Sequence, residues 1–124
     1  MKLRIRGNSI RLRLTQSEVQ AFLNRGWVSD QIVFDPRQEN QLRYELKIAD
    51  CDRLSVEFVD QKISVLVPEQ QGLIWANTEE VSMAYESEDE TATLPKILVE
   101  KDFQCLKVRP GGEDQDTFPN PHAS

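Results

Sequence analysis

The sequence is poor in the residues on which many enzymes and metal sites depend. Its 124 residues include one histidine, two cysteines and five glycines. It contains no glycine-rich phosphate loop, no G-x-S-x-G turn, no H-E-x-x-H pair and no C-x-x-C pair. These motifs mark nucleotide-binding loops, serine hydrolases, zinc proteases and redox or zinc sites. A single histidine also leaves few residues that could serve as the general acid or base in the common schemes of catalysis. We therefore expect a non-enzymatic protein without a cofactor.

Long hydrophobic runs are missing as well. No apolar stretch approaches the length that spans a bilayer, so we expect no membrane partner. Lys2, Arg4 and Arg6 interrupt the start of the chain, where a secretory leader would need an apolar segment. Cys51 and Cys105 fit reduced thiols. These features predict a cytoplasmic protein.

Positive charge is scarce over most of the chain and concentrated at its start. The formal net charge is −6, which disfavours nucleic acid as a partner. Residues 2–13 nevertheless carry five cations and no acid, whereas acids gather at residues 86–90 and 113–116. Opposite charges at the two ends would permit head-to-tail contacts, so a homo-oligomer is one expected assembly.

Residues 1–14 alternate between apolar and basic side chains on either side of Gly7-Asn8-Ser9. Strict alternation is typical of a half-buried strand, because successive side chains leave opposite faces. Gly7 and Asn8 can supply the positive φ angles that a three-residue hairpin loop needs. The pattern predicts an antiparallel hairpin with one apolar face and one face of five cations.

The next residues predict a helix over Gln16–Arg25. Thr15 is a favoured N-cap, and Glu18 is placed three residues later to complete a capping box. Val19 begins an apolar stripe at helical spacing. Gly26 follows the last helical residue, where a left-handed conformation commonly ends a helix.

The remaining pattern predicts an α+β fold in a single domain over residues 1–110, followed by an extended acidic, proline-containing tail over residues 111–124. We expect a mainly antiparallel, curled sheet of about six to eight strands, able to approach a barrel, with one N-terminal helix and one short helix. The short helix is expected near residues 69–77. Further strands are expected at 27–34, 41–48, 53–59, 62–67, 81–86 and 96–100, of which 41–67 form an antiparallel meander.

Three stretches resemble a known family. They are M-K-L-R-I-R-G-N-S-I-R-L-R-L-T-Q-S-E-V at the start, I-L-V-E-K-D-F-Q-C-L at 97–106 and E-D-Q-D-T-F-P-N-P-H at 113–122. They are similar to hallmark segments of a family of small bacterial proteins known as a domain of unknown function. The resemblance covers both ends well and the middle loosely. It implies a cytoplasmic bacterial protein with no known activity, and it carries over no catalytic residue.

The basic strand face is the first candidate site. Arginine side chains suit phosphate or carboxylate groups, so a small anionic ligand is one expected partner. Two alternatives remain open: pairing with acids of neighbouring strands, such as Glu45 and Glu57, and docking of an acidic protein surface. The face consists of Lys2, Arg4, Arg6, Arg11 and Arg13.

The C-terminal tail holds the second set of candidates. Cys105 and His122, with nearby acids, are residue types that bind transition metals, but their spacing matches no zinc motif, so we expect no metal. An aromatic side chain beside prolines is suited to docking in a groove of its own domain or of a partner. The expected docking residues are Phe118, Pro119 and Pro121.

These observations favour a non-enzymatic binding or interaction module. The alternative is an anion-binding protein or an enzyme that uses the basic face for a phosphate- or carboxylate-containing small molecule.

Overall fold

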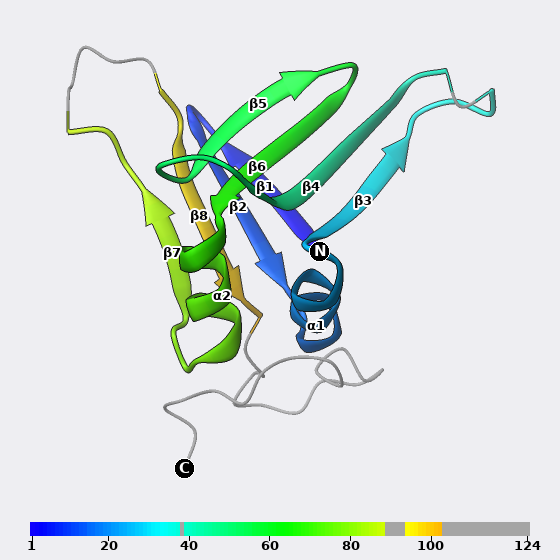
Figure 1. The fold of residues 1–124 in the computed structure, drawn as a ribbon. Coiled ribbons are helices and arrows are strands. Elements are labelled where there is room, and N and C mark those ends of the chain that lie inside the picture. Colours follow the sequence, from blue (N-terminus) through cyan, green and yellow to red (C-terminus); the bar gives the residue numbers. More distant parts are fainter. Residues whose placement is uncertain (38, 89–93, 103–124) are drawn as a thin grey trace, which may run out of the picture.

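The computed structural model describes residues 1–37, 39–88 and 94–102. These residues form eight strands and two helices (Figure 1). In chain order the elements are β1 (Lys2–Arg6), β2 (Ser9–Leu14), α1 (Gln16–Arg25), β3 (Trp27–Val33), β4 (Gln41–Ala49), β5 (Ser55–Val59), β6 (Lys62–Pro68), α2 (Glu69–Asn77), β7 (Ser82–Tyr85) and β8 (Lys96–Lys101).

The strands make two four-stranded sheets. Sheet A has the order β1-β2-β8-β7, and sheet B has the order β3-β4-β6-β5. In each sheet the central pair is parallel and both outer pairs are antiparallel. Both helices lie at one end of the sheets, and the tips of the β1–β2, β3–β4 and β5–β6 hairpins point toward the other end (Figure 1).

The topology repeats itself. A hairpin, a helix and a second hairpin (β1, β2, α1, β3, β4) are followed by the same series (β5, β6, α2, β7, β8). Each sheet takes the first hairpin of one half and the second hairpin of the other, so the order β1-β2-β8-β7 corresponds to β5-β6-β4-β3. The two halves of the chain thus exchange their second hairpins, as the subunits of a domain-swapped dimer do.

This arrangement corrects the expected fold. The α+β class with abundant strands is confirmed, but the single, mainly antiparallel sheet curled toward a barrel is wrong, because there are two mixed sheets. The expected arrangement of one N-terminal helix plus one short helix is also wrong. The helices have ten and nine residues, and each connects one sheet to the other.

The predicted meander of residues 41–67 is also corrected. β6 pairs in parallel with β4 and antiparallel with β5, so β6 lies between them. Burial explains the order: Val65 and Val67 on β6 are fully buried, whereas Phe58 and Val59 on β5 are exposed. The more apolar strand takes the central place, and β5 becomes an edge.

Tight turns close two of the hairpins. Arg6 pairs with Ser9, so the first loop has two residues, Gly7 and Asn8, and not three. Gly7 has a φ of 54°, as expected at the first position of a two-residue hairpin loop. Asp60 and Gln61 both have positive φ between β5 and β6, which fits a type I′ turn.

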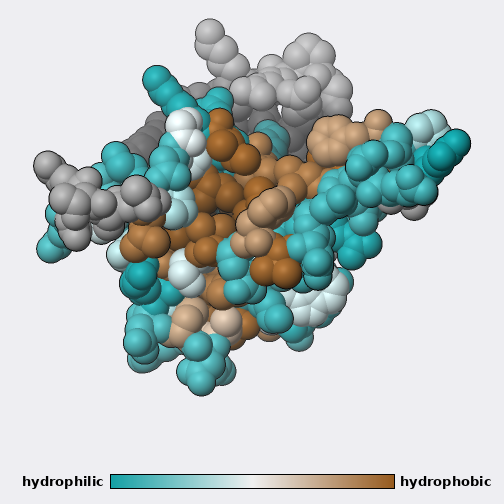
Figure 2. All heavy atoms as spheres, turned by 90° about the horizontal axis from the view of Figure 1, so that it is seen from above, coloured by the Kyte–Doolittle hydropathy of each residue, from teal (hydrophilic) through white to brown (hydrophobic). Residues whose placement is uncertain are grey.

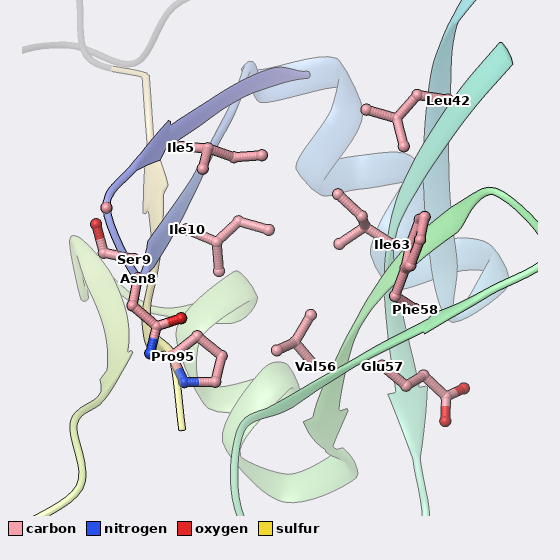
Figure 3. A pocket seen from close by; sticks show the side chains of 11 residues that line it. Ile5, Asn8, Ser9, Ile10, Leu42, Val56, Glu57, Phe58, Ile63 and Pro95 are labelled. Atoms are coloured by element: carbon pink, nitrogen blue, oxygen red, sulfur yellow. The ribbon is translucent and has the colours of Figure 1, made fainter. Parts of the chain in front are cut away.

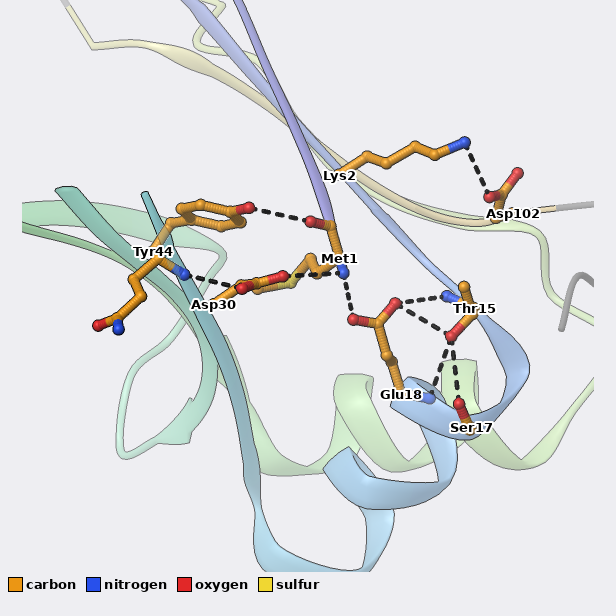
Figure 4. A network of polar contacts seen from close by, with 9 residues as sticks. Met1, Lys2, Thr15, Ser17, Glu18, Asp30, Tyr44 and Asp102 are labelled. Carbon is orange, nitrogen blue, oxygen red and sulfur yellow. Dashed lines mark hydrogen bonds and ion pairs between the residues drawn. The ribbon is translucent and has the colours of Figure 1, made fainter. Parts of the chain in front are cut away.

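The capping box of α1 is confirmed. Glu18 N–H donates to Thr15 Oγ1 at 3.4 Å, and Thr15 N–H donates to Glu18 Oε1 at 2.9 Å (Figure 4). At the other end, Gly26 is left-handed with a φ of 83°, and its N–H donates to Phe22 O at 2.8 Å. Both ends of α1 are therefore fixed by local sequence.

The core fills the space between the sheets and the helices. Leu12, Leu14 and Val99 enter it from sheet A, and Phe22 and Trp75 enter it from the helices. The Phe22 and Trp75 rings meet edge to face, with centroids 6.1 Å apart. Gly72 on α2 lies so near Phe22 and Val67 that an added Cβ would come within 3.1 Å of each. A glycine that weakens the helix locally thus permits close packing of the helices.

Candidate functional site

An apolar cleft opens at the end of the sheets opposite the helices. Viewed from this end, apolar surface lies between polar arms of the protein (Figure 2). The cleft has a volume of about 370 Å³, which lies within the range of small-molecule and peptide-anchor pockets. Its apolar lining comes from the β1–β2 hairpin on one side and sheet B on the other, and consists mainly of Ile5, Ile10, Leu42, Val56, Phe58 and Ile63.

The strand alternation explains why these side chains meet. Ile5 and Ile10 are cross-strand partners on the inner face of sheet A, and Phe58 and Ile63 are cross-strand partners on sheet B. The two groups point toward one another across the cleft (Figure 3). Ile10 is buried, but Ile5 is 59% exposed and Phe58 is 66% exposed. Apolar side chains that face each other from two sheets therefore remain accessible to solvent.

The polar lining of the cleft is sparse. Asn8 and Ser9 lie at the hairpin turn, and Glu57 points away from the space between the apolar groups (Figure 3). General acid–base catalysis requires titratable groups aimed at a reacting atom. Within the described residues, the cleft lining offers no histidine, cysteine, lysine or aspartate. The arrangement can hold an apolar group and orient it by a few hydrogen bonds.

The predicted basic face occupies the outer side of sheet A. Lys2, Arg4 and Arg6 leave β1 on this side, and Arg4 lies directly opposite Arg11 on β2. A second depression, of about 330 Å³, lies here. Four cations line it: Arg4, Arg6, Arg11 and Lys96. Lys96 was not among the predicted residues, because its strand adjoins β2 only through the parallel pairing.

Acids of β8 and its end compensate part of this face. Glu100 accepts from Arg11 Nε at 2.7 Å and from Arg13 Nε at 2.8 Å. Lys2 Nζ lies 3.4 Å from Asp102. The sequence suggested Glu45 and Glu57 for this task. Both belong to sheet B, and Glu45 contacts Lys62 and Ser64 instead.

Arg4 and Arg6 differ from the other cations of the basic face. Neither forms an ion pair with a carboxylate in the part of the chain that the structure describes. Lys96 pairs with Glu86 at 3.0 Å, but both side chains are more than 60% exposed, so this pair is weak. The positive potential of the depression therefore centres on Arg4 and Arg6.

A polar network joins the sheets near α1. The Met1 ammonium group pairs with Glu18 and lies 3.5 Å from Asp30, and Tyr44 Oη donates to Met1 O at 3.2 Å (Figure 4). Burial raises the pKa of Tyr44, and the carboxylates of Asp30 and Glu18 raise it further. Tyr44 therefore remains a neutral hydrogen-bond donor, a structural role.

Two other titratable side chains lie away from the cleft lining. Burial lowers the pKa of Lys101, while Glu80 and Glu79 act against this shift. Its ammonium group donates to Thr78 O at 2.6 Å beside the Trp75 ring. Burial also raises the pKa of Cys51, which favours the protonated thiol over a reactive thiolate.

The tail candidates fall beyond the structural description. Cys105, His122, Phe118, Pro119 and Pro121 all lie outside the described residues. Among the described residues, no three of the carboxylate, thiol and imidazole side chains gather to hold a metal ion. Neither described helix has the length and apolar character that crossing a bilayer requires.

The cleft is the feature that sequence reasoning missed. Its side chains follow the same alternation as the core, so the pattern assigned them to the interior. The sequence offered one sign that these side chains are exposed, namely their place in the strand. Ile5 and Phe58 both lie one residue before the end of a strand that enters a tight turn.

Comparison with known proteins gives a family and no activity. No curated protein and no solved structure matches the chain. A family model described as a family of unknown function (DUF7009) matches residues 1–122. This match spans the two sheets, both helices and the tail segment 113–121, so the chain belongs to the family of unknown function DUF7009.

Proposed function

We propose that the protein is a non-enzymatic binding module of the bacterial cytoplasm, and that the apolar cleft is its binding site. The occupant that fits is an extended peptide segment with a large apolar side chain. The two cysteines without a C-x-x-C pairing favour a reducing compartment. The resemblance of the sequence to a family of small bacterial proteins supports a bacterial source.

The solvent exposure of Ile5 and Phe58 carries this proposal. Burying an exposed apolar side chain is worth about 1.5–3 kcal/mol, so a protein gains stability by covering such residues. Both residues remain more than half exposed at the mouth of a concave surface. Exposed apolar residues that gather in a concavity, in contrast to scattered ones, mark interaction sites.

A neutral apolar fluorophore provides the test of the cleft. N-phenyl-1-naphthylamine carries no charge, so the basic face contributes little to its binding. We expect saturable fluorescence enhancement with the wild-type protein and a loss of affinity of about tenfold in Phe58→Ser, because removing a ring contact worth about 1.4 kcal/mol changes affinity tenfold. Fluorescence titration at constant protein concentration measures the effect.

Ile74→Ser is the matched control for this titration. Ile74 is 43% exposed on α2 and does not line the cleft. We expect its affinity for the fluorophore to equal that of the wild type, with unchanged far-UV circular dichroism in both variants. Equal affinities for Phe58→Ser and wild type would rule out the cleft as the site.

The basic depression favours a second candidate function, the binding of a small phosphate- or carboxylate-containing molecule. Arg4 and Arg6 lack a carboxylate partner within the described residues, and guanidinium groups suit such anions. Inorganic pyrophosphate is a suitable probe for isothermal titration. We expect Arg4→Ala with Arg6→Ala to weaken its binding at least tenfold. The control is Arg37→Ala with Arg43→Ala, two exposed arginines outside this depression.

A further inference from the structure

The apolar cleft and the basic depression adjoin each other at the β1–β2 hairpin. Ser9 and Ile10 line both. Along β1 the alternation sends Ile5 into the cleft and Arg4 and Arg6 to the outer face. The exposed turn Gly7-Asn8 forms the rim of the cleft at the tip of the hairpin, next to the depression. One ligand can therefore contact both surfaces by passing around this turn.

Such a ligand must meet three requirements. It needs an apolar group for the cleft, anionic groups for Arg4 and Arg6, and an extended linkage between them. A small rigid molecule cannot bend around the edge of a sheet to meet cations on its other face. An extended peptide can, because successive residues advance by 3.2–3.4 Å and turn their side chains to alternate sides.

The chain itself contains a segment of this chemistry. Glu113, Asp114 and Asp116 precede Phe118 by two to five residues. Residues 111–124 contain no lysine or arginine, so nothing in the segment opposes its attraction to the basic depression. Pro119 and Pro121 favour extended polyproline geometry, which lowers the entropy lost on docking.

The connecting chain is long enough. Pro95 lines the cleft, and β8 runs from there to Asp102, whose N–H donates to Leu14 O near the start of α1. The six residues of β8 correspond to about 20 Å. Residues 103–112 can span about 33 Å when extended, so the acids can return along the sheet to the β1–β2 hairpin.

We propose that residues 113–121 of this chain occupy the site, with Phe118 in the apolar cleft and the three acids at Arg4 and Arg6. This proposal rests on the proposed function and names its partner. The same molecule supplies the segment, because a short tether gives an effective concentration in the millimolar range, above that of a second copy in dilute solution. A foreign peptide must then displace the tail.

Methyl NMR of the full-length protein tests the docking directly. We expect nuclear Overhauser effects between the Phe118 ring and the methyl groups of Ile5 and Ile63. In Phe118→Ser these methyl resonances shift, whereas Ile74, on α2, does not move. Asp114→Asn with Asp116→Asn shifts the same resonances partway, because the charge attraction is removed and the ring remains. Glu79→Gln with Glu80→Gln is the charge-matched control.

One result would contradict docking of the tail in the cleft. If the Ile5 and Ile63 resonances coincide in wild type and Phe118→Ser, the tail does not occupy the cleft. A mixture of isotopically labelled and unlabelled protein identifies the source of the contact. Overhauser effects that arise only between molecules would assign the tail to a second copy and contradict docking within one chain.

Binding of N-phenyl-1-naphthylamine separates this inference from the proposed function. If the tail fills about nine tenths of the sites, its removal raises the apparent affinity about tenfold. We expect this gain in full-length Phe118→Ser, and its loss when Phe58→Ser is added. If binding of the probe is weakened by Phe58→Ser but is equally tight in wild type and Phe118→Ser, docking of the tail is contradicted. The proposed function of the cleft would still stand. If no variant binds the probe at the cleft, the proposed function itself is wrong.

Discussion

Replacing Trp75 by alanine is expected to lower the free energy of unfolding by about 3–5 kcal/mol, the usual cost of removing a large aromatic side chain from a core. Trp75 is fully buried, meets Phe22 edge to face and donates from Nε1 to Val81 O at 3.2 Å. It joins α2 to α1 and to the segment before β7. Urea unfolding followed by far-UV circular dichroism measures the change.

Two variants control this experiment. Trp27→Ala removes the same side chain where it is 41% exposed and covered by Arg25, so we expect a loss of about 1 kcal/mol or less. Trp75→Phe keeps most of the volume and loses only the indole N–H. Val81 O still accepts from Lys101 N–H, so this variant should retain most of the stability. Equal losses in Trp75→Ala and Trp27→Ala would contradict the packing described.

Neutralising Glu100 is expected to produce the second large effect. Its side chain is only 12% exposed and accepts charge-assisted hydrogen bonds from both Arg11 and Arg13. Glu100→Gln removes the one carboxylate that Arg11 and Arg13 share within the described residues. We expect a loss of about 2 kcal/mol, near the value of one hydrogen bond to a charged group, because the arginines are partly solvated.

The ionic strength and a second pair provide the controls for Glu100→Gln. Glu86→Gln breaks the exposed pair with Lys96 on the same sheet, and its cost should be within about 0.5 kcal/mol. In 1 M NaCl the Debye length falls to about 3 Å, so the loss in Glu100→Gln should become smaller. A loss that is independent of salt would indicate packing and not charge as its cause.

Local structure was readable from the sequence because local rules determine it. The bounds Gln16–Arg25 of α1 follow from Thr15, Glu18 and Gly26, whose capping contacts form as expected. Strand positions followed from alternation, with ends that differ by one or two residues. These features depend on residues within a few positions of one another, which a single sequence displays.

The pairing of the strands was not readable, since it depends on distant segments. β2 pairs with β8, more than 80 residues away, and no local signal marks this partner. The parallel β4–β6 pair joins segments that lie closer in the sequence, but there the short turns between consecutive strands made an antiparallel meander the natural expectation. The same limit hid Glu100, which reaches Arg11 and Arg13 only through the pairing of β2 with β8.

The candidate sites divide in the same way. The basic face was visible because its five cations belong to one hairpin. The cleft was not, because Ile5 and Phe58 come from different sheets and their exposure depends on how far the sheets separate. Alternation reports which face a residue occupies, but not whether that face is covered.

The exchange of hairpins between the halves has a consequence for synthesis of the chain. Sheet B uses only residues 27–68, so all its strands emerge together. The β1–β2 hairpin must wait for β8, about 80 residues later, which takes about 4–16 s at usual translation rates. During this interval Leu12 and Leu14 lack the parallel strand that pairs with β2 in the finished protein, where both side chains are buried. The nascent chain therefore presents a strand with apolar side chains and an unpaired edge, which a ribosome-bound chaperone is suited to shield.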